Sequence, residues 1–257
     1  HGTDITIVGQ DRSYQAITRF SIERSDRITS VSQWLKDETI KAFGCSNQRI
    51  DVIPNFVDPE VFERAHHGDG LHQELGGGKR VLMHISNFRP VKRVRDVVRV
   101  FAKVRERVPS VLVMVGDGPD RGAAEEEARL LGVASDVRFL GKIDQVAPLL
   151  AAADVYVFPS ESESFGLSAL EALASGVPVV AARVGGVPEV VRDGVTGALL
   201  PLGDVDGMAA AVVRFLDPAV WAAASRATAA DARARFATHD VVAGYERLYA
   251  EALEQVR

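Results

Sequence analysis

The chain has 257 residues, 47% of them hydrophobic, which is enough for one large or two modest domains with a buried core. Its formal net charge of -5 at pH 7 argues against a nucleic-acid partner, and its single cysteine, Cys45, excludes an intrachain disulfide or a cysteine-based zinc site. No apolar run reaches the roughly 20 residues that span a bilayer, so we expect a cytoplasmic protein without stable membrane insertion.

The first 79 residues divide into short elements and a linker. "AITRFSIERS" reads as a helix, "RITSVS" (27–32) as a strand, "QWLKDETIKAFG" (33–44) as an amphipathic helix and "RIDVIPNFVD" (49–58) as a short strand that enters a turn. Residues 63–79 contain "HHGDG" and "GGGK", the composition of a flexible linker. The chain starts without methionine inside what looks like a functional motif, so we expect it to be N-terminally truncated.

After the linker, apolar strands alternate with helical segments. The predicted strands lie within 80–86, 111–119, 136–142, 155–160, 178–182 and 196–200, and the predicted helices within 91–109, 121–133, 146–153, 188–194 and 205–217, with one more helix after 160 and a mostly helical remainder. Runs such as "VLVMV" and "VYVF" suit parallel strands that are buried on both faces. This alternation predicts a doubly wound α/β domain, in which ligands bind beyond the carboxyl ends of the strands.

Three of these strand ends carry ambiguous motifs. In "SNFRPVKR" (86–93), Arg89 and Lys92 flank Pro90 at the entry to a helix, where an anion would be stabilised, but a solvated basic loop explains the segment equally well. "GDGP" (116–119) is more readily a tight turn than a close approach of backbone to ligand. "RVGGVPEV" (183–190) is an ordinary loop or a ligand contact.

The segment "ESESFGLSALEALASGVP" is harder to explain by structure alone. If its helix starts near Phe165, Glu163 lies in the loop before the helix and Glu171 faces outward after one to two turns. The N–H groups of Gly166 and Leu167 would suit phosphate oxygens, Glu171 could accept hydrogen bonds from ribose hydroxyls, and Glu163 could bind sugar hydroxyls. The helix dipole explains an acidic residue before the helix but not Glu171 within it.

In this order, "SNFRPVKR", "VGDGP", "ESFGLSALE", "GVPVVAARVGGVPEVV" and "DGVTGALL" resemble the retaining glycosyltransferases of family 4. That family has the two-domain GT-B fold with two Rossmann-like halves. The resemblance implies that 1–58 is the last segment of the acceptor domain, 59–220 the nucleotide-sugar (donor) domain, and 221–257 a set of helices that cross back toward the acceptor domain.

The opening "HGTDITIVGQDRSYQAITRFSIERSDRITSVS" and "IDVIPNFVD" narrow the resemblance further. They are similar to the subgroup that transfers N-acetylglucosamine from UDP-GlcNAc (UDP-N-acetylglucosamine) to the 2-hydroxyl of L-malate, the first step of bacillithiol biosynthesis. In that subgroup Lys92 would hold the donor diphosphate, with Asn87 and Arg89 beside it. Glu171 would bind the uridine ribose, and the Leu167 N–H would add to the phosphate site.

The remaining roles concern the sugar and the acceptor. Glu163 would hold the sugar hydroxyls together with three backbone groups, those of Ser164, Phe165 and Gly166. His1 matches a histidine near the anomeric region of the donor, which with Lys92 and Glu163 makes the predicted catalytic set. Thr3 and Arg19 match positions that bind the anionic acceptor, a task that suits the bidentate guanidinium.

The resemblance implies a reaction that needs no cofactor and no metal, because the charge on departing UDP would be offset by Lys92, Arg89 and helix N-termini. The departing phosphate would accept the acceptor's proton, so no protein side chain is assigned as general base. The expected partners are two small molecules, UDP-GlcNAc and L-malate, with no nucleic acid, and a homo-oligomer is left open.

Other functions stay open at this point. One is a family-4 transferase with another sugar donor or acceptor, and another is a non-catalytic nucleotide-sugar-binding module. A non-hydrolysing UDP-GlcNAc epimerase would share the fold, but the order of the motifs argues against it.

Overall fold

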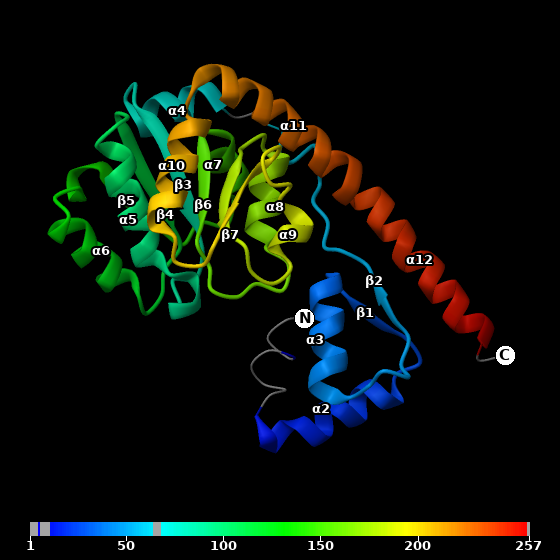
Figure 1. Cartoon of the computed structure of the whole chain (residues 1–257). Coiled ribbons are helices and arrows are strands. Elements are labelled where there is room, and N and C mark those ends of the chain that lie inside the picture. Colours follow the sequence, from blue (N-terminus) through cyan, green and yellow to red (C-terminus); the bar gives the residue numbers. More distant parts are fainter. Residues whose placement is uncertain (1–4, 6–10, 64–67, 256–257) are drawn as a thin grey trace.

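The computed structural model describes residue 5 and residues 11–63 and 68–255 (Figure 1). Its centre is a six-stranded, fully parallel sheet with the strand order β5-β4-β3-β6-β7-β8. The strands are β3 (Arg80–Ile85), β4 (Ser110–Val115), β5 (Val137–Gly141), β6 (Val155–Phe158), β7 (Val179–Ala182) and β8 (Gly197–Leu200). The chain runs outward from β3 through β4 to β5 and then returns to place β6 on the other side of β3, which makes β3 and β6 the topological switch point. The predicted doubly wound parallel sheet is confirmed.

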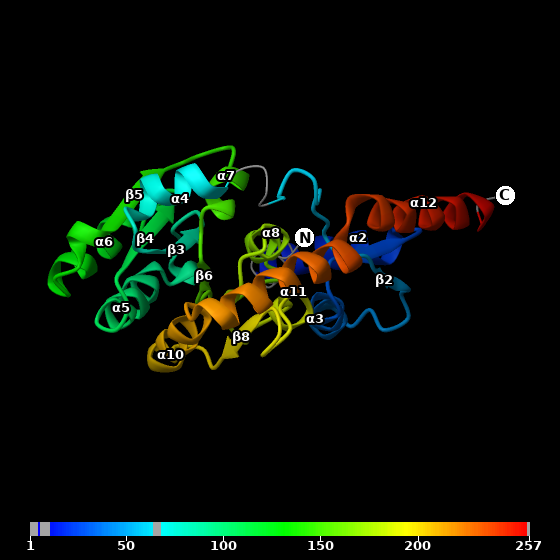
Figure 2. The same ribbon diagram turned by 90° about the horizontal axis from the view of Figure 1, so that it is seen from above.

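Helices cover both faces of the sheet, because successive strand residues point to opposite sides. On one face lie α4 (Gly68–Gly76), α7 (Ala147–Ala151) and α8 (Leu167–Ala174), and on the other α5 (Val94–Arg105), α6 (Arg121–Leu130) and α10 (Val205–Phe215). Figure 2 shows α4 and α7 on one side of the sheet and α5 and α10 on the other. Three short turns complete this part of the chain: η3 (Pro90–Lys92), η4 (Ala134–Asp136) and α9 (Val187–Val190).

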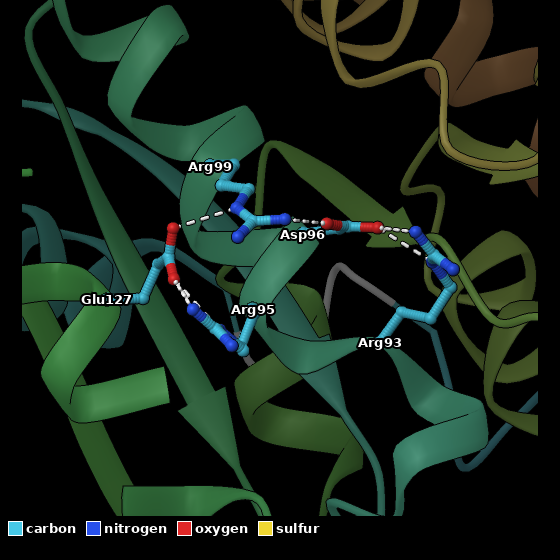
Figure 3. Close-up of polar contacts among 5 residues, drawn as sticks. All are labelled: Arg93, Arg95, Asp96, Arg99 and Glu127. Atoms are coloured by element: carbon cyan, nitrogen blue, oxygen red, sulfur yellow. Dashed lines mark hydrogen bonds and ion pairs between the residues drawn. The ribbon is translucent and has the colours of Figure 1, made fainter. Parts of the chain in front are cut away.

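A charged cluster joins the outer surfaces of α5 and α6 (Figure 3). The Arg99 guanidinium donates from Nε to Glu127 at 2.7 Å and from a terminal nitrogen to Asp96 at 3.1 Å. Arg95 donates to the same Glu127 at 2.6 Å, and Arg93 donates from Nε to Asp96 at 2.7 Å. Both carboxylates are buried, and the bond from Arg99 holds the pKa of Glu127 below its usual value. We call these five residues the α5–α6 cluster.

The first part of the chain forms a small separate layer. It consists of α2 (Arg12–Arg24), β1 (Ile28–Ser30), α3 (Gln33–Phe43) and β2 (Ile50–Val52), with β1 and β2 paired in parallel. Gly44 ends α3 in the left-handed conformation with φ of 65°, a conformation that favours glycine. The predicted strands and helices of this segment are confirmed.

Two long helices end the chain and connect its two parts (Figure 1). The first, α11 (Pro218–Phe236), packs against α8 and α10, and the second, α12 (Thr238–Gln255), runs beside β2. There Ile53 packs against Val241 and Leu248, and Arg49 donates to Glu251 at 3.1 Å. The last helix therefore lies against the segment that begins the chain, while the division after residues 58 and 220 stays a prediction.

One element was predicted wrongly. Part of the expected flexible linker 63–79 is the helix α4, although the segment is rich in glycine. Leu75 is buried beside Val81, and Leu71 packs against the same core cluster. Packing of these two leucines thus outweighs the low helix propensity of the glycines.

Among the described residues, no single helix is long and apolar enough to cross a bilayer. Only α10 and α11 taken together reach that length and composition, and they meet at a bend of 94°.

Candidate functional site

The candidate site lies where β3 and β6 end, at the switch point of the sheet. The chain leaves β3 through a loop that contains η3, and it leaves β6 through a loop that leads into α8. Lys92 in the first loop and Glu163 in the second meet at 2.6 Å between Nζ and Oε1, and both side chains are largely buried. The structure therefore brings two of the predicted site residues into one ion pair.

The loop after β3 is tightly held by its neighbours. Phe88 is fully buried with φ of 41°, and its carbonyl accepts the N–H of Asp120 at 2.9 Å. A Cβ added to Gly116 would lie 1.8 Å from the Ser86 carbonyl oxygen, and Gly116 itself has φ of 119°. The "GDGP" glycines therefore allow two backbone segments to approach each other, so the expectation of a turn alone missed their main role.

The predicted donor-binding residues of this loop differ in their surroundings. Asn87 and Arg89 are exposed, and within the described residues neither side chain has a hydrogen-bond or ion-pair partner. Lys92 is less exposed and is followed by Arg93, which adopts φ of 50° before α5 begins. Among the described residues, this loop thus presents Arg89 without a partner, whereas Glu163 holds Lys92 and Asp96 holds Arg93.

The loop after β6 is held in the same way. Gly186 donates its N–H to the Glu163 carbonyl at 2.9 Å, and a Cβ added to Gly185 would lie 1.9 Å from that oxygen. A Cβ on Gly186 would lie 2.3 Å from the Ser164 carbonyl oxygen. The glycines of "RVGG" therefore support the loop of Glu163, which was not among the roles expected for them.

The helix α8 begins two residues later than expected. Gly166 precedes it with φ of 97°, and Leu167 is its first residue, so the N–H groups of Leu167 and Ser168 have no partner within the helix. The Phe165 ring is buried against Phe236, with ring centroids 5.7 Å apart. Only the backbone of Phe165 is therefore left for a ligand, and the predicted role of Phe165 involves its backbone alone.

Glu171 is more enclosed than expected. It was predicted to face outward, but it lies partly buried in the second turn of α8, and burial raises its pKa to about 7. Its carboxylate has no hydrogen-bond or ion-pair partner among the described residues. The helix packs closely on β6 and α11, which explains the enclosure. A partly buried carboxylate without a partner at a strand end is a candidate ligand contact.

The beginning of α3 touches the same loop, which the sequence reasoning missed. Ser32 donates its hydroxyl to the Ser164 carbonyl at 2.6 Å. The Glu189 carboxylate of α9 accepts the N–H groups of Gln33 and Trp34, each at 2.8 Å. A serine directly before a predicted helix was the available signal for Ser32, whereas no local pattern could show that Glu189 caps a helix 155 residues away.

The predicted acceptor residues are not joined to this pair. Arg19 is exposed on α2 and donates from Nε to Glu23 at 2.7 Å, one turn along the same helix. His1 and Thr3 lie outside the described residues. Within the described part of the chain, no group of three or more His, Cys, Asp or Glu side chains is placed to hold a metal ion.

Comparison with known families covers most of the chain. Residues 79–218 match the family described as "Glycosyl transferases group 1", and residues 1–61 match "Glycosyltransferase Family 4". The chain is 41% identical, over 98% of its length and 67% of the relative's, to "N-acetyl-alpha-D-glucosaminyl L-malate synthase" of Bacillus anthracis. It is 32% identical, over 92% of its length, to "D-inositol 3-phosphate glycosyltransferase 2" of Catenulispora acidiphila, of which it spans 58%.

Solved structures share the fold. Sucrose-phosphate synthase from Thermosynechococcus elongatus has a TM-score of 0.82 at 23% identity, covering 98% of this chain and 65% of that one. HepE of Anabaena in complex with UDP-glucose has a TM-score of 0.81 at 25% identity, covering 95% of this chain and 68% of that one. These likenesses confirm the predicted GT-B fold class.

Proposed function

Because the chain belongs to the group 1 and family 4 glycosyltransferases, we propose that it carries the donor site of an enzyme that moves N-acetylglucosamine from UDP-GlcNAc to the 2-hydroxyl of L-malate. The anomeric configuration is retained in this reaction. The observation that carries the proposal is that the Lys92–Glu163 pair and the unpartnered Glu171 both lie on the segments that follow β3 and β6, at the switch point. The sugar and the acceptor are those in the name of the 41% identical relative, and UDP as the carrier of the sugar is part of the proposal.

In the proposed complex, the diphosphate takes the place of Glu163 as the partner of Lys92. Glu163 is then free to accept hydrogen bonds from the sugar hydroxyls, together with the backbone of Ser164 and Gly166. The unpaired N–H of Leu167 adds to the phosphate site. These donors stabilise the negative charge that builds on UDP as the glycosidic bond breaks.

Glu171 binds the nucleoside in this proposal. Its carboxylate accepts hydrogen bonds from the ribose hydroxyls, which supply the partners that the protein itself does not provide. Asn87 and Arg89 lie exposed on the loop after β3 and contact the phosphates. The departing phosphate takes the proton of the acceptor hydroxyl, so no side chain is needed as general base.

We propose that this donor site works without a divalent metal, because Lys92, Arg89 and the first N–H groups of α8 supply the positive charge for the diphosphate. Calorimetry of UDP binding with Mg²⁺ and with EDTA tests the proposal. Equal affinity in both buffers supports it, and an absolute requirement for the metal contradicts it.

Acceptor binding is proposed for Thr3 and Arg19, with His1 near the anomeric carbon. L-Malate carries two carboxylates, and the planar fork of an arginine can bind one of them in a bidentate manner. The cytoplasmic location stays a prediction, and a homo-oligomer stays open.

Product analysis tests the proposed function. The whole protein that carries this chain is incubated with UDP-GlcNAc and L-malate, and the product is identified by mass spectrometry and its anomeric configuration by NMR. We expect the α-linked N-acetylglucosaminyl malate. Transfer only to an inositol phosphate would indicate another family-4 acceptor, and UDP binding without any transfer would indicate a binding module.

A further inference from the structure

The two central strands separate just before the candidate site. The pair β3 and β6 is registered only at Leu82↔Val155 and Met83↔Tyr156. On its other side β3 stays paired with β4 as far as Ile85, and β6 stays paired with β7 as far as Phe158. The backbone ladder at the switch point therefore stops two residues before either strand ends.

A tyrosine replaces the missing ladder on one face of the sheet. The Tyr156 hydroxyl of β6 accepts the N–H of Ile85 at 3.2 Å and donates to the Ile85 carbonyl at 3.0 Å. Tyr156 is fully buried, so both backbone groups of Ile85 would be left without a partner if the hydroxyl were removed. One side chain from β6 thus fixes the last residue of β3.

A histidine makes the reciprocal connection from β3 on the other face. His84 Nδ1 lies 2.9 Å from the Val157 carbonyl, and Nε2 lies 2.8 Å from the Ser86 hydroxyl. Because a carbonyl can only accept, Nδ1 carries the proton and Nε2 accepts the hydroxyl hydrogen. Ser86 Oγ in turn accepts the N–H of Phe88 at 3.3 Å. The connection therefore runs from β6 into the loop that holds Lys92.

The surroundings keep this histidine neutral, as the connection requires. His84 is fully buried, and burial lowers its pKa to about 4, with a further contribution from the charge of Lys92. A protonated ring would turn Nε2 into a donor facing the Ser86 hydroxyl. In the sequence, His84 stands out as a polar residue inside the apolar run of "RVLMHIS", and this was the available signal for its role.

We propose that His84 and Tyr156 are positioning residues of the donor site. They fix the separation of β3 and β6 at their carboxyl ends, and so they set where Lys92 stands relative to Glu171. A nucleotide that touches both residues needs this separation in advance, because any reorganisation on binding lowers the affinity. The inference rests on the proposed function, since it assumes that UDP binds between these two loops.

A purely structural role is the competing explanation, because buried hydrogen bonds also stabilise the sheet. The two roles differ in their coupling to Lys92. If Tyr156 acts by placing Lys92, its removal matters only when Lys92 is there to be placed. If it acts only on stability, the losses of UDP affinity are absent or independent of Lys92.

The experiment is a double-mutant cycle of UDP binding. The Kd of each variant is measured by ligand-observed NMR, which can also quantify weak affinities. The variants are Tyr156→Phe, Lys92→Gln and the combination of both. We expect Tyr156→Phe to raise the Kd about five- to tenfold alone and less than about twofold in the Lys92→Gln background. Tyr245→Phe in α12 is the matched control, and Val212→Ala in α10 controls for lower thermal stability; both should leave the Kd unchanged.

The outcomes separate this inference from the proposed function. If the unaltered chain binds UDP in a Lys92-dependent manner but Tyr156→Phe has no effect, or the same effect in both backgrounds, the inference is wrong and the proposed site stands. If the unaltered chain does not bind UDP, both are wrong. Should Tyr156→Phe not fold, Ser86→Ala replaces it in the same cycle, because it cuts the His84 connection at a partly exposed hydroxyl, and a loss of about threefold that needs Lys92 is expected.

Discussion

Two charged clusters begin one residue apart in the sequence and differ in how their charges are satisfied. The α5–α6 cluster starts at Arg93, and each of its carboxylates, Asp96 and Glu127, has two arginine partners (Figure 3). The switch-point cluster, which consists of Lys92, Glu163 and Glu171, starts one residue earlier. It has one ion pair and one carboxylate without a partner among the described residues.

The pKa values of the two clusters move in opposite directions. Hydrogen bonds from Arg99 and Arg95 lower the pKa of Glu127, whereas burial without a partner raises that of Glu171 to about 7. A carboxylate whose two oxygens already accept hydrogen bonds from arginines gains little from a further donor, whereas a partly buried one without a partner gains most from a ligand that donates hydrogen bonds. From this comparison we expect the switch-point cluster to bind the ligand and the α5–α6 cluster to stabilise the fold.

Removing one cation from each cluster should have the largest effect. We expect Lys92→Ala to weaken UDP binding by about a hundredfold, because a charged partner of the diphosphate is lost. Arg99→Ala should leave the UDP affinity unchanged and lower the free energy of unfolding by about 1–2 kcal/mol, since Glu127 keeps only Arg95. Calorimetry with UDP and urea unfolding of both variants test this; a loss of UDP affinity in Arg99→Ala would break the comparison.

Substitutions of the two glutamates in the switch-point cluster should have the next largest effect, and they should differ in their effect on UDP affinity. Glu171→Ala should weaken UDP binding about tenfold, since the ribose loses its acceptor. Glu163→Ala should leave the affinity for UDP nearly unchanged, because UDP lacks the sugar whose hydroxyls Glu163 would bind, yet it should impair use of the donor sugar. Binding of UDP and of UDP-GlcNAc to both variants is the measurement. Equal losses for UDP alone would contradict the division of roles.

The raised pKa of Glu171 predicts a smaller, pH-dependent effect on stability. The folded chain holds a proton that the unfolded chain, with a pKa of about 4.3, has released by neutral pH. Its contribution to stability is therefore present at low pH and falls as the pH rises from about 4 to about 7. Against Glu171→Gln, the unaltered chain should lose on the order of 1–2 kcal/mol between about pH 5 and pH 8, allowing for partial exposure. The measurement is the free energy of unfolding of both proteins at several pH values. If it changes with pH in the same way in both proteins, the prediction is wrong.

Arg19 is expected to have the smallest influence on the donor site. Its partner is Glu23 on α2, so Arg19→Lys and Arg19→Ala should leave the UDP affinity unchanged. The KM for malate should rise in the whole enzyme, because lysine keeps the charge but loses the planar fork. Steady-state kinetics with malate varied at saturating donor check this. An unchanged KM in both variants would remove Arg19 from the acceptor site.

Much of the fold could be predicted because its signals are local. The buried runs "VLVMV" and "VYVF" became β4 and β6, and the serine and glycine around residues 33–43 marked the ends of α3. The helix α4 was missed because its stability comes from packing of Leu71 and Leu75 on a core formed by distant residues. The glycine content of that segment indicates only a low local helix propensity, and it contains no information about those contacts.

For the site, the sequence could predict which residues stand at strand ends but not their surroundings. The ion pair of Lys92 with Glu163 joins residues 71 positions apart, and the enclosure of Glu171 depends on how α8 packs. The reciprocal connections of His84 and Tyr156 appear only when the register of β3 and β6 is known. Such contacts follow from the topology of the sheet, which local patterns do not encode.

The most direct measurement of the central claim is a crystal structure of the chain with UDP. We predict that Lys92 Nζ leaves Glu163 and contacts the diphosphate, that Glu171 accepts hydrogen bonds from the ribose, and that the α5–α6 cluster is unchanged. A nucleotide bound elsewhere, with the Lys92–Glu163 pair intact and Glu171 still without a partner, would contradict the account.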